Sequence, residues 1–232
     1  QSQGAQRFAF LGDLVGYGPD PNECISRIRS LPNLRCVLGN HDAAVLGKMN
    51  EAAFNYEAGL AISWTRRVLN AESQSFLAGL PETDVVDEVT LVHGSPRNPV
   101  WEYLMDYPTA LQSFPFYKTR LCFVGHTHVP ALWEENPGER PPALMHEFLP
   151  LNISGRCIIN PGAVGQPRDH DRRASFALFD PAQSTWVLQR VEYDIAGVQE
   201  RVRKTSLPWR NALRLSDGWY GNKSGVNSVN GM

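Results

Sequence analysis

Several features that define other protein classes are absent from this 232-residue sequence. No apolar run approaches the roughly 20 residues that a membrane-spanning helix needs. The first residues, QSQGAQR, lack the basic and then apolar layout of a secretory signal. The formal net charge is only -2, so the chain has no overall basic field for neutralising the phosphates of duplex nucleic acid. These absences argue against a membrane protein and against a dedicated nucleic-acid binder.

Cysteine is scarce and shows neither a disulfide framework nor the C-x-x-C spacing of a structural zinc site. Most of the four cysteines lie inside apolar runs; they are Cys24, Cys36, Cys122 and Cys157. Buried free thiols are typical of a reducing compartment, and we therefore expect the protein to act in the cytoplasm. With 42% apolar residues, the chain can bury one sizeable core without disulfides.

The first half alternates apolar runs, polar loops and helical patterns, which is typical of an α/β domain. Residues 7–11 and 34–38 are apolar runs too short for helices, and each is followed by a loop rich in glycine and polar residues. Asp20 is a candidate N-cap for a helix whose first residue is Pro21. A second helix is predicted over residues 52–69.

The second half is dominated by predicted strands. Short β-rich runs occur in residues 83–93 and 121–124, and several more occur between 143 and 191. A helix is expected over residues 195–204, followed by a polar segment rich in Gly, Asn and Ser. We expect one domain over residues 1–205 and a helical and polar tail over 206–232.

Metal-capable side chains follow four of the predicted strands, in the segments LGD, LGNHD, LVHG and FVGHTH. Because ligands bind beyond the carboxyl ends of strands in open α/β sheets, we expect these loops to converge on one rim. Four of the six histidines lie there, next to glycine or close to another histidine. The residues of this set are Asp13, Asn40, His41, His93, His126 and His128.

The chemistry of this set indicates an open, catalytic metal site. Carboxylate oxygen, amide oxygen and imidazole nitrogen together suit borderline divalent ions such as Mn, Fe, Zn, Ni or Co. No cysteine lies within the segments LGD, LGNHD, LVHG and FVGHTH, which argues against a closed structural zinc site.

The ordered segments GDLVGYGPDP, GNHD, HGSPR and GHTH resemble the signature of the calcineurin-like metallophosphoesterase superfamily. The following NPGAVGQPRD resembles its small bacterial phosphodiesterase or phosphatase members, and the resemblance covers roughly residues 8–194. It implies an α/β fold of two stacked mixed β-sheets flanked by helices, with two divalent metal ions at the rim. It also implies hydrolysis of a small phosphomonoester or phosphodiester by a metal-bridging hydroxide.

The resemblance assigns a role to each candidate metal ligand. Asp13 would bridge both ions through its carboxylate. Asn40, His93 and His126 would complete one metal site, and His128 would bind the other ion. The chain offers that second ion few ligands, because superfamily members carry an Asp-x-His motif at the end of an earlier strand. We therefore expect the natural polypeptide to begin upstream of Gln1 with a strand of this kind.

The resemblance makes His41 the acid that faces the phosphate, with Asp42 holding it protonated and oriented. A simpler interpretation is that His41 and Asp42 only cap the following helix. Arg97 and Arg168 are candidate phosphate clamps, although loop arginines also commonly form surface ion pairs. Asn160, in an Asn-Pro-Gly sequence, is interpreted as a structural turn residue.

Two other functions remain open at this stage. A degenerate superfamily member could bind metal or a phosphorylated ligand without turnover, as the absent Asp-x-His motif would permit. A structural or interaction protein could reuse the fold. The presence of both His41 and Asp42 favours hydrolysis over a binding module, which has no need of an acid. The intact GHTH and GNHD segments argue against a purely structural protein.

Overall fold

The computed structural model describes residues 4–136 and 149–218. Two short strands and most of the helices lie in the first part of the chain. These elements are β1 (Phe8–Phe10), α1 (Pro21–Arg29), β2 (Leu34–Cys36), α2 (Asn40–Val45), η1 (Glu51–Ala53), α3 (Tyr56–Val68) and α4 (Ala71–Ala78). In the described ranges, no helix is long and apolar enough to cross a membrane.

Most strands lie in the middle of the chain, and two helices follow them. The middle elements are β3 (Thr83–Val86), β4 (Val89–Val92), α5 (Tyr107–Ser113), η2 (Phe114–Phe116), β5 (Leu121–Phe123), β6 (Pro130–Glu134) and β7 (Leu151–Asn152). The last are β8 (Cys157–Pro161), β9 (Ala174–Asp180), β10 (Thr185–Val191), α6 (Ile195–Arg203) and α7 (Trp209–Asp217).

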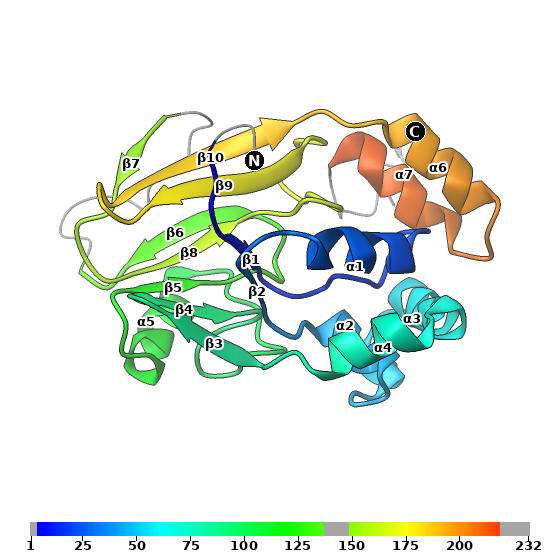
Figure 1. Cartoon of the computed structure of the whole chain (residues 1–232), viewed down its shortest axis with the longest axis horizontal. Coiled ribbons are helices and arrows are strands. Elements are labelled where there is room, and N and C mark those ends of the chain that lie inside the picture. The colour runs from blue at the N-terminus through cyan, green and yellow to red at the C-terminus, as the bar shows by residue number, and fades with distance from the viewer. Residues whose placement is uncertain (1–3, 137–148, 219–232) are drawn as a thin grey trace, which may run out of the picture.

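The strands form a two-layer arrangement with helices outside it (Figure 1). A five-stranded sheet has the order β3-β4-β5-β8-β6, in which β4, β5 and β8 are parallel while β3 and β6 are antiparallel edge strands. A three-stranded antiparallel sheet has the order β7-β10-β9. The short strands β1 and β2 form a separate parallel pair. The predicted α/β architecture with stacked sheets is confirmed.

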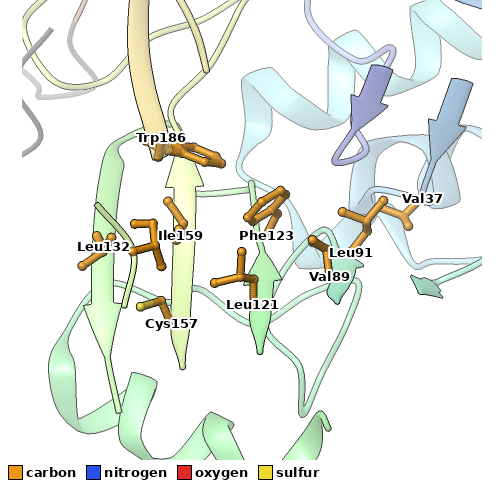
Figure 2. Close-up of a cluster of buried hydrophobic side chains, with 10 residues drawn as sticks. Val37, Val89, Leu91, Leu121, Phe123, Leu132, Cys157, Ile159 and Trp186 are labelled. Atoms are coloured by element: carbon orange, nitrogen blue, oxygen red, sulfur yellow. The ribbon is translucent and has the colours of Figure 1, made fainter. Parts of the chain in front are cut away.

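Alternation along the central strands builds a core on each face of the five-stranded sheet. Leu121 and Phe123 face the three-stranded sheet, where the ring of Trp186 packs against Phe123 (Figure 2). Cys122 and Val124 point to the opposite face, which α5 and η2 cover. Burial on both faces explains why residues 121–124 form a continuous apolar run.

The β1–β2 pair is attached to the five-stranded sheet through the same core. Val37, directly after β2, is fully buried in the cluster between the sheets, and Leu11, directly after β1, packs against it. This packing holds the loops that follow β1 and β2 against the ends of β4 and β5. Among the described strands, β1 pairs with β2 alone, so its other edge is open. The expected preceding strand stays a prediction.

The helical part corrects one detail of the sequence analysis and bears on another. Pro21 does begin α1, but the side chain of Asp20 makes no cap bond and instead accepts a 2.8 Å hydrogen bond from Arg201. Helix α7 shares a hydrophobic cluster with α3 and α6, to which Leu207 and Ala212 contribute. Residues on both sides of the predicted boundary between 205 and 206 thus pack together, and the boundary itself stays a prediction. Residues 219–232 of the predicted tail lie outside the described residues.

We predict that Leu121→Ala lowers the free energy of unfolding by about 2–5 kcal/mol, because Leu121 is fully buried between the sheets. Leu111→Ala in α5 is the matched control, since that side chain is 43% exposed; its effect should stay within about 0.5 kcal/mol. Urea unfolding followed by circular dichroism measures both. Equal losses in the two variants would show that the core is misplaced.

Candidate metal centre

Four predicted ligands meet at one rim, although 113 positions, from 13 to 126, separate the first from the last. Asp13 and Asn40 follow the parallel pair β1 and β2, while His93 and His126 follow the parallel neighbours β4 and β5. Asp13, His93 and His126 present ligand atoms that all lie within 4.8 Å of one another. The expected convergence of strand-end loops is therefore present for these residues.

The Nε2 atom of His93 is the point on which the ligand atoms converge. It lies 2.9 Å from Oδ1 of Asn40 and 3.0 Å from Nδ1 of His126. Its distance to Oδ2 of Asp13 is 3.3 Å. Asn40, His93 and His126 are all buried. Four polar side chains thus share one small, water-poor volume.

Backbone carbonyls fix which nitrogen of each imidazole carries hydrogen. Nδ1 of His93 lies 2.6 Å from the carbonyl oxygen of Leu11, and Nε2 of His126 lies 3.1 Å from that of Trp101. A carbonyl oxygen only accepts, so both of these nitrogens donate. In the neutral rings, the inward atoms, Nε2 of His93 and Nδ1 of His126, then present lone pairs to each other and to two oxygen acceptors.

Such an arrangement requires positive charge at its centre, from a proton on Nε2 of His93 or from a metal ion, and the donor set fits a divalent metal ion. Ligand atoms bound at about 2.0–2.1 Å to one ion lie about 3 Å apart, which matches the distances around His93. Neutral imidazoles whose outer N–H groups bond to carbonyls are the usual form of metal-binding histidine. The set has oxygen and nitrogen ligands without thiolate, as expected for a borderline divalent ion.

The electrostatics of the cluster also favour positive charge at its centre. Burial alone would raise the pKa of Asp13, but His93, His41 and His126 outweigh it and hold that pKa well below its usual range. Burial alone would lower the pKa of His93, yet Asp13 and the Leu11 carbonyl raise it. The Asp13 carboxylate therefore stays ionised and stabilises positive charge at Nε2 of His93, whether a proton or a metal ion supplies it.

The loops that carry the ligands have unusual backbone conformations. Asp13, His126 and His128 have φ angles of 53°, 61° and 61°, in the left-handed region that non-glycine residues rarely adopt. Each such residue costs of the order of 1–3 kcal/mol unless its surroundings hold it. Gly39 is required for close approach, because a Cβ atom there would lie 2.1 Å from Oδ1 of Asp13.

The predicted acid, His41, lies beside the cluster and is buried. Its backbone N–H donates a 2.9 Å hydrogen bond to Oδ1 of Asp13, and its ring packs between Tyr17 and Phe54, at centroid distances of 4.5 and 5.1 Å. Nδ1 of the ring is buried without a hydrogen-bond partner. Burial is the main cause that lowers the pKa of His41 to about 4, and the positive charges of His93 and Arg168 contribute to this lowering. The negative charge of Asp13 acts in the opposite direction.

Asp42 does not orient the ring of His41, so that expectation is wrong. Its two carboxylate oxygens accept hydrogen bonds from the backbone N–H groups of Gly39, at 3.0 Å, and Val15, at 3.2 Å. The hydrogen bond to Gly39 confirms the capping interpretation for Asp42 alone, and the contact with Val15 also ties the Asp13 loop to α2. Burial and the neighbouring Asp13 raise the pKa of Asp42 to about 7.

The two candidate arginines differ in position. Arg97 forms an ion pair with Glu102, in which Nε lies 2.7 Å from one carboxylate oxygen and 2.9 Å from the other. Its guanidinium is thus engaged in the ordinary ion pair that was the alternative to a phosphate clamp. Arg168 lies beside His128, whose carbonyl oxygen accepts a 3.2 Å hydrogen bond from its backbone N–H, and its Nη2 donates a 3.3 Å hydrogen bond to Oε1 of Gln166.

His128 is close to the centre but is not part of the cluster around His93 in the described residues. Its Nδ1 atom donates a 2.6 Å hydrogen bond to the carbonyl oxygen of Gln166, which leaves Nε2 as the acceptor. Burial lowers its pKa to about 3. His128 is therefore a neutral imidazole with a fixed tautomer, as a metal ligand requires, and its binding of a second ion stays a prediction.

Sequence reasoning did not find the carbonyl groups that fix these imidazoles. The carbonyls of Leu11, Trp101 and Gln166 have no signal in residue type, because every residue carries a carbonyl group. Asn160 is confirmed as a turn residue, since its Oδ1 accepts from the N–H of Gly162, but its further bonds to Gly125 and Thr127 were not expected. Its place in an apolar run before Pro-Gly was the available signal, because a buried asparagine needs partners for its amide.

Comparisons with solved structures identify proteins of similar fold. A crystal structure described as a metallophosphoesterase from Sphaerobacter thermophilus has a TM-score of 0.81 and 45% identity, covering 90% of this chain and 86% of that one. A hypothetical protein from Pyrococcus horikoshii OT3 shares the fold, with a TM-score of 0.77 and 20% identity over 95% of this chain and 89% of that one.

Sequence comparison also finds related proteins. An uncharacterized protein from Methanocaldococcus jannaschii is 39% identical over 214 residues, which cover 90% of this chain and 85% of that protein. The family model for the calcineurin-like phosphoesterase superfamily domain matches residues 1–184. The strand-end cluster of Asp13, His93 and His126 thus lies inside the matched region, and the chain belongs to the calcineurin-like phosphoesterase superfamily.

Proposed function

We propose that this protein hydrolyses phosphate esters with the help of divalent metal ions. The observation that carries the proposal is the convergence of Asn40, His126 and Asp13 on Nε2 of His93, with both imidazole tautomers fixed by carbonyls. These four side chains would hold one ion, and Asp13 with His128 would contribute to a second. Bound there, divalent ions supply Lewis acidity that polarises phosphate oxygens and lowers the pKa of water.

His41 is the group that we assign to the leaving oxygen. It is held next to Asp13 by a backbone hydrogen bond and has a buried Nδ1 with no partner in the protein. A neutral imidazole donates from one nitrogen and accepts at the other, so the ring can offer a hydrogen bond or a proton to an ester oxygen. The surrounding rings of Tyr17 and Phe54 limit its rotation and exclude water from one side.

Arg168 is the arginine that we assign to the phosphate. Its backbone N–H donates a 3.2 Å hydrogen bond to the carbonyl of His128, which fixes the start of its side chain at the centre. A guanidinium matches two phosphate oxygens at once, and this positive charge would offset part of the cost of burying a phosphate dianion. Arg97, which is paired with Glu102, is not assigned this role.

The substrate that we propose is a small phosphate ester in a reducing compartment. The net charge of -2 provides no basic groove for a duplex, so phosphate recognition must be local. All four cysteines are free thiols, which supports a location in the cytoplasm.

We predict that His126→Gly weakens Mn²⁺ binding at least tenfold, because the variant removes one nitrogen ligand from the cluster. His170→Gly is the matched control, since both histidines have positive φ angles that glycine adopts readily and His170 is exposed. Isothermal titration calorimetry of the chelator-treated proteins measures the affinities. Equal affinities for the two variants, or no binding by the parent protein, would contradict the proposed ligand set.

We predict that His41→Ala lowers kcat for an aryl phosphate ester by roughly a hundredfold or more, the usual scale for loss of a general acid. Metal content should remain unchanged, because the contact to Asp13 comes from the backbone of residue 41. Steady-state kinetics and elemental analysis of the same preparation test both points. Unchanged kcat would remove His41 from the chemistry, and loss of metal would show that its ring supports the ligands instead.

We also predict that small esters are hydrolysed in preference to duplex DNA at physiological salt. The local phosphate-binding group, Arg168, offers one contact, whereas duplex binding depends on many cationic contacts along the backbone. A screen of aryl monoesters, aryl diesters and a DNA duplex under the same conditions measures the preference. Rapid duplex cleavage with inert small esters would overturn this substrate assignment.

A further inference from the structure

We infer that Asn160 is a positioning residue for the metal centre, which holds the Gly125–His128 loop in its ligand-binding conformation. The inference rests on the proposed function, because it concerns the same metal site. Asn160 lies in β8, next to β5 in the five-stranded sheet, and its side chain is fully buried. It therefore approaches the loop after β5 from inside the protein and does not touch the ligand atoms described above.

The nitrogen and the oxygen of the Asn160 side-chain amide form hydrogen bonds with different partners. Nδ2 donates to the carbonyl oxygen of Gly125 at 2.6 Å and to Oγ1 of Thr127 at 2.9 Å. Oδ1 accepts from the N–H of Gly162 at 2.8 Å. The two donor bonds reach the residues on either side of His126, while the acceptor bond closes the local Asn-Pro-Gly turn.

These hydrogen bonds distinguish a positioning role of Asn160 from ordinary turn formation. A turn of this kind needs only the side-chain oxygen, which asparagine and aspartate supply equally well. The two N–H donors are not required for the turn, and both point to the loop that carries His126. A fully buried amide that used only its oxygen would leave two donors unsatisfied, which is costly.

The loop needs such support because its backbone is strained. His126 and His128 both have φ angles of 61°, and they flank Thr127, which Asn160 contacts. Two non-glycine residues in this region persist only where the surroundings hold them. The downstream segment adds two further bonds, from Nδ1 of His128 to the Gln166 carbonyl and from the Arg168 N–H to the His128 carbonyl.

The consequence is that Asn160 sets the direction of the His126 imidazole. The bond to the Gly125 carbonyl holds the peptide unit before His126, the bond to Oγ1 holds the side chain of Thr127 after it, and the Trp101 carbonyl then fixes the ring. Loss of the donor bonds lets the loop relax out of the left-handed conformation and moves Nδ1 of His126 away from Nε2 of His93. Groups that orient metal ligands in this way typically change metal affinity by 10- to 100-fold.

The experiment compares Asn160→Asp with Asn160→Ala and with the control Ser175→Ala. Asn160→Asp keeps the turn acceptor and removes both donors, whereas Asn160→Ala removes all three bonds. Ser175 is also buried and donates a 2.6 Å hydrogen bond to the carbonyl of Pro161, so the control disturbs the same turn without touching the loop. Calorimetry with Mn²⁺ gives the affinity, and the visible absorption of the Co²⁺-loaded proteins reports ligand geometry.

We expect both Asn160 variants to bind Mn²⁺ 10- to 100-fold more weakly and to change the Co²⁺ spectrum, while Ser175→Ala matches the parent protein. Parent-like affinity and spectrum in Asn160→Asp, with or without an effect of Asn160→Ala, would overturn the inference and leave Asn160 a turn residue. Failure of the parent protein to bind either ion would instead contradict the proposed function.

Thr127→Val provides a second approach if the Asn160 variants do not fold. This variant removes Oγ1 of Thr127, which accepts one hydrogen bond from Nδ2 of Asn160. It leaves the Asn-Pro-Gly turn intact. We expect a several-fold loss of Mn²⁺ affinity and a shift in the Co²⁺ absorption relative to the parent protein. A parent-like affinity and spectrum in this variant would overturn the inference.

Discussion

The contact between the inward nitrogens of two imidazole rings is the constraint on which the rest of this structure depends. Nε2 of His93 and Nδ1 of His126 lie 3.0 Å apart, and carbonyl acceptors on the far side of each ring prevent either neutral imidazole from turning a hydrogen inward. With oxygens of Asn40 and Asp13 at the same point, the arrangement is repulsive until a cation occupies it. The fold holds four acceptors together in readiness for a metal ion.

Most of the surrounding architecture keeps these acceptors close. Parallel pairing of β1 with β2 and of β4 with β5 sends four loops to one rim, and the packing of Val37 into the core between the sheets holds the two pairs together. Left-handed backbone at Asp13 and His126 then turns the side chains inward. Two buried polar residues, Asp42 in α2 and Asn160 in β8, bond to the backbone of the loops that carry the ligands. The cost of strain is thereby offset within the site.

The sequence was sufficient to predict the main strands and helices and several of the site residues, because both depend on local sequence patterns. Ligands such as Asn40 and His93 directly follow apolar strands, so their loops are predictable from the strand pattern alone. The role of Asp42 was not predictable, because its partner Val15 lies 27 residues earlier and takes part through a backbone N–H. Likewise, Arg97 could pair with Glu102 or with a phosphate, and only the folded geometry selects between these partners. Side-chain chemistry identifies a site, whereas tertiary contacts assign the supporting roles.

Anomalous diffraction from a crystal loaded with Mn²⁺ tests the central claim most directly. The account predicts a peak at bonding distance, about 2.0–2.3 Å, from Nε2 of His93 and Nδ1 of His126, with Oδ1 of Asn40 also bound. The histidine rings should keep their hydrogen bonds to the carbonyls of Leu11 and Trp101. A metal-loaded crystal in which the ion lies elsewhere, with the two nitrogens still 3.0 Å apart and no ion between them, would contradict it.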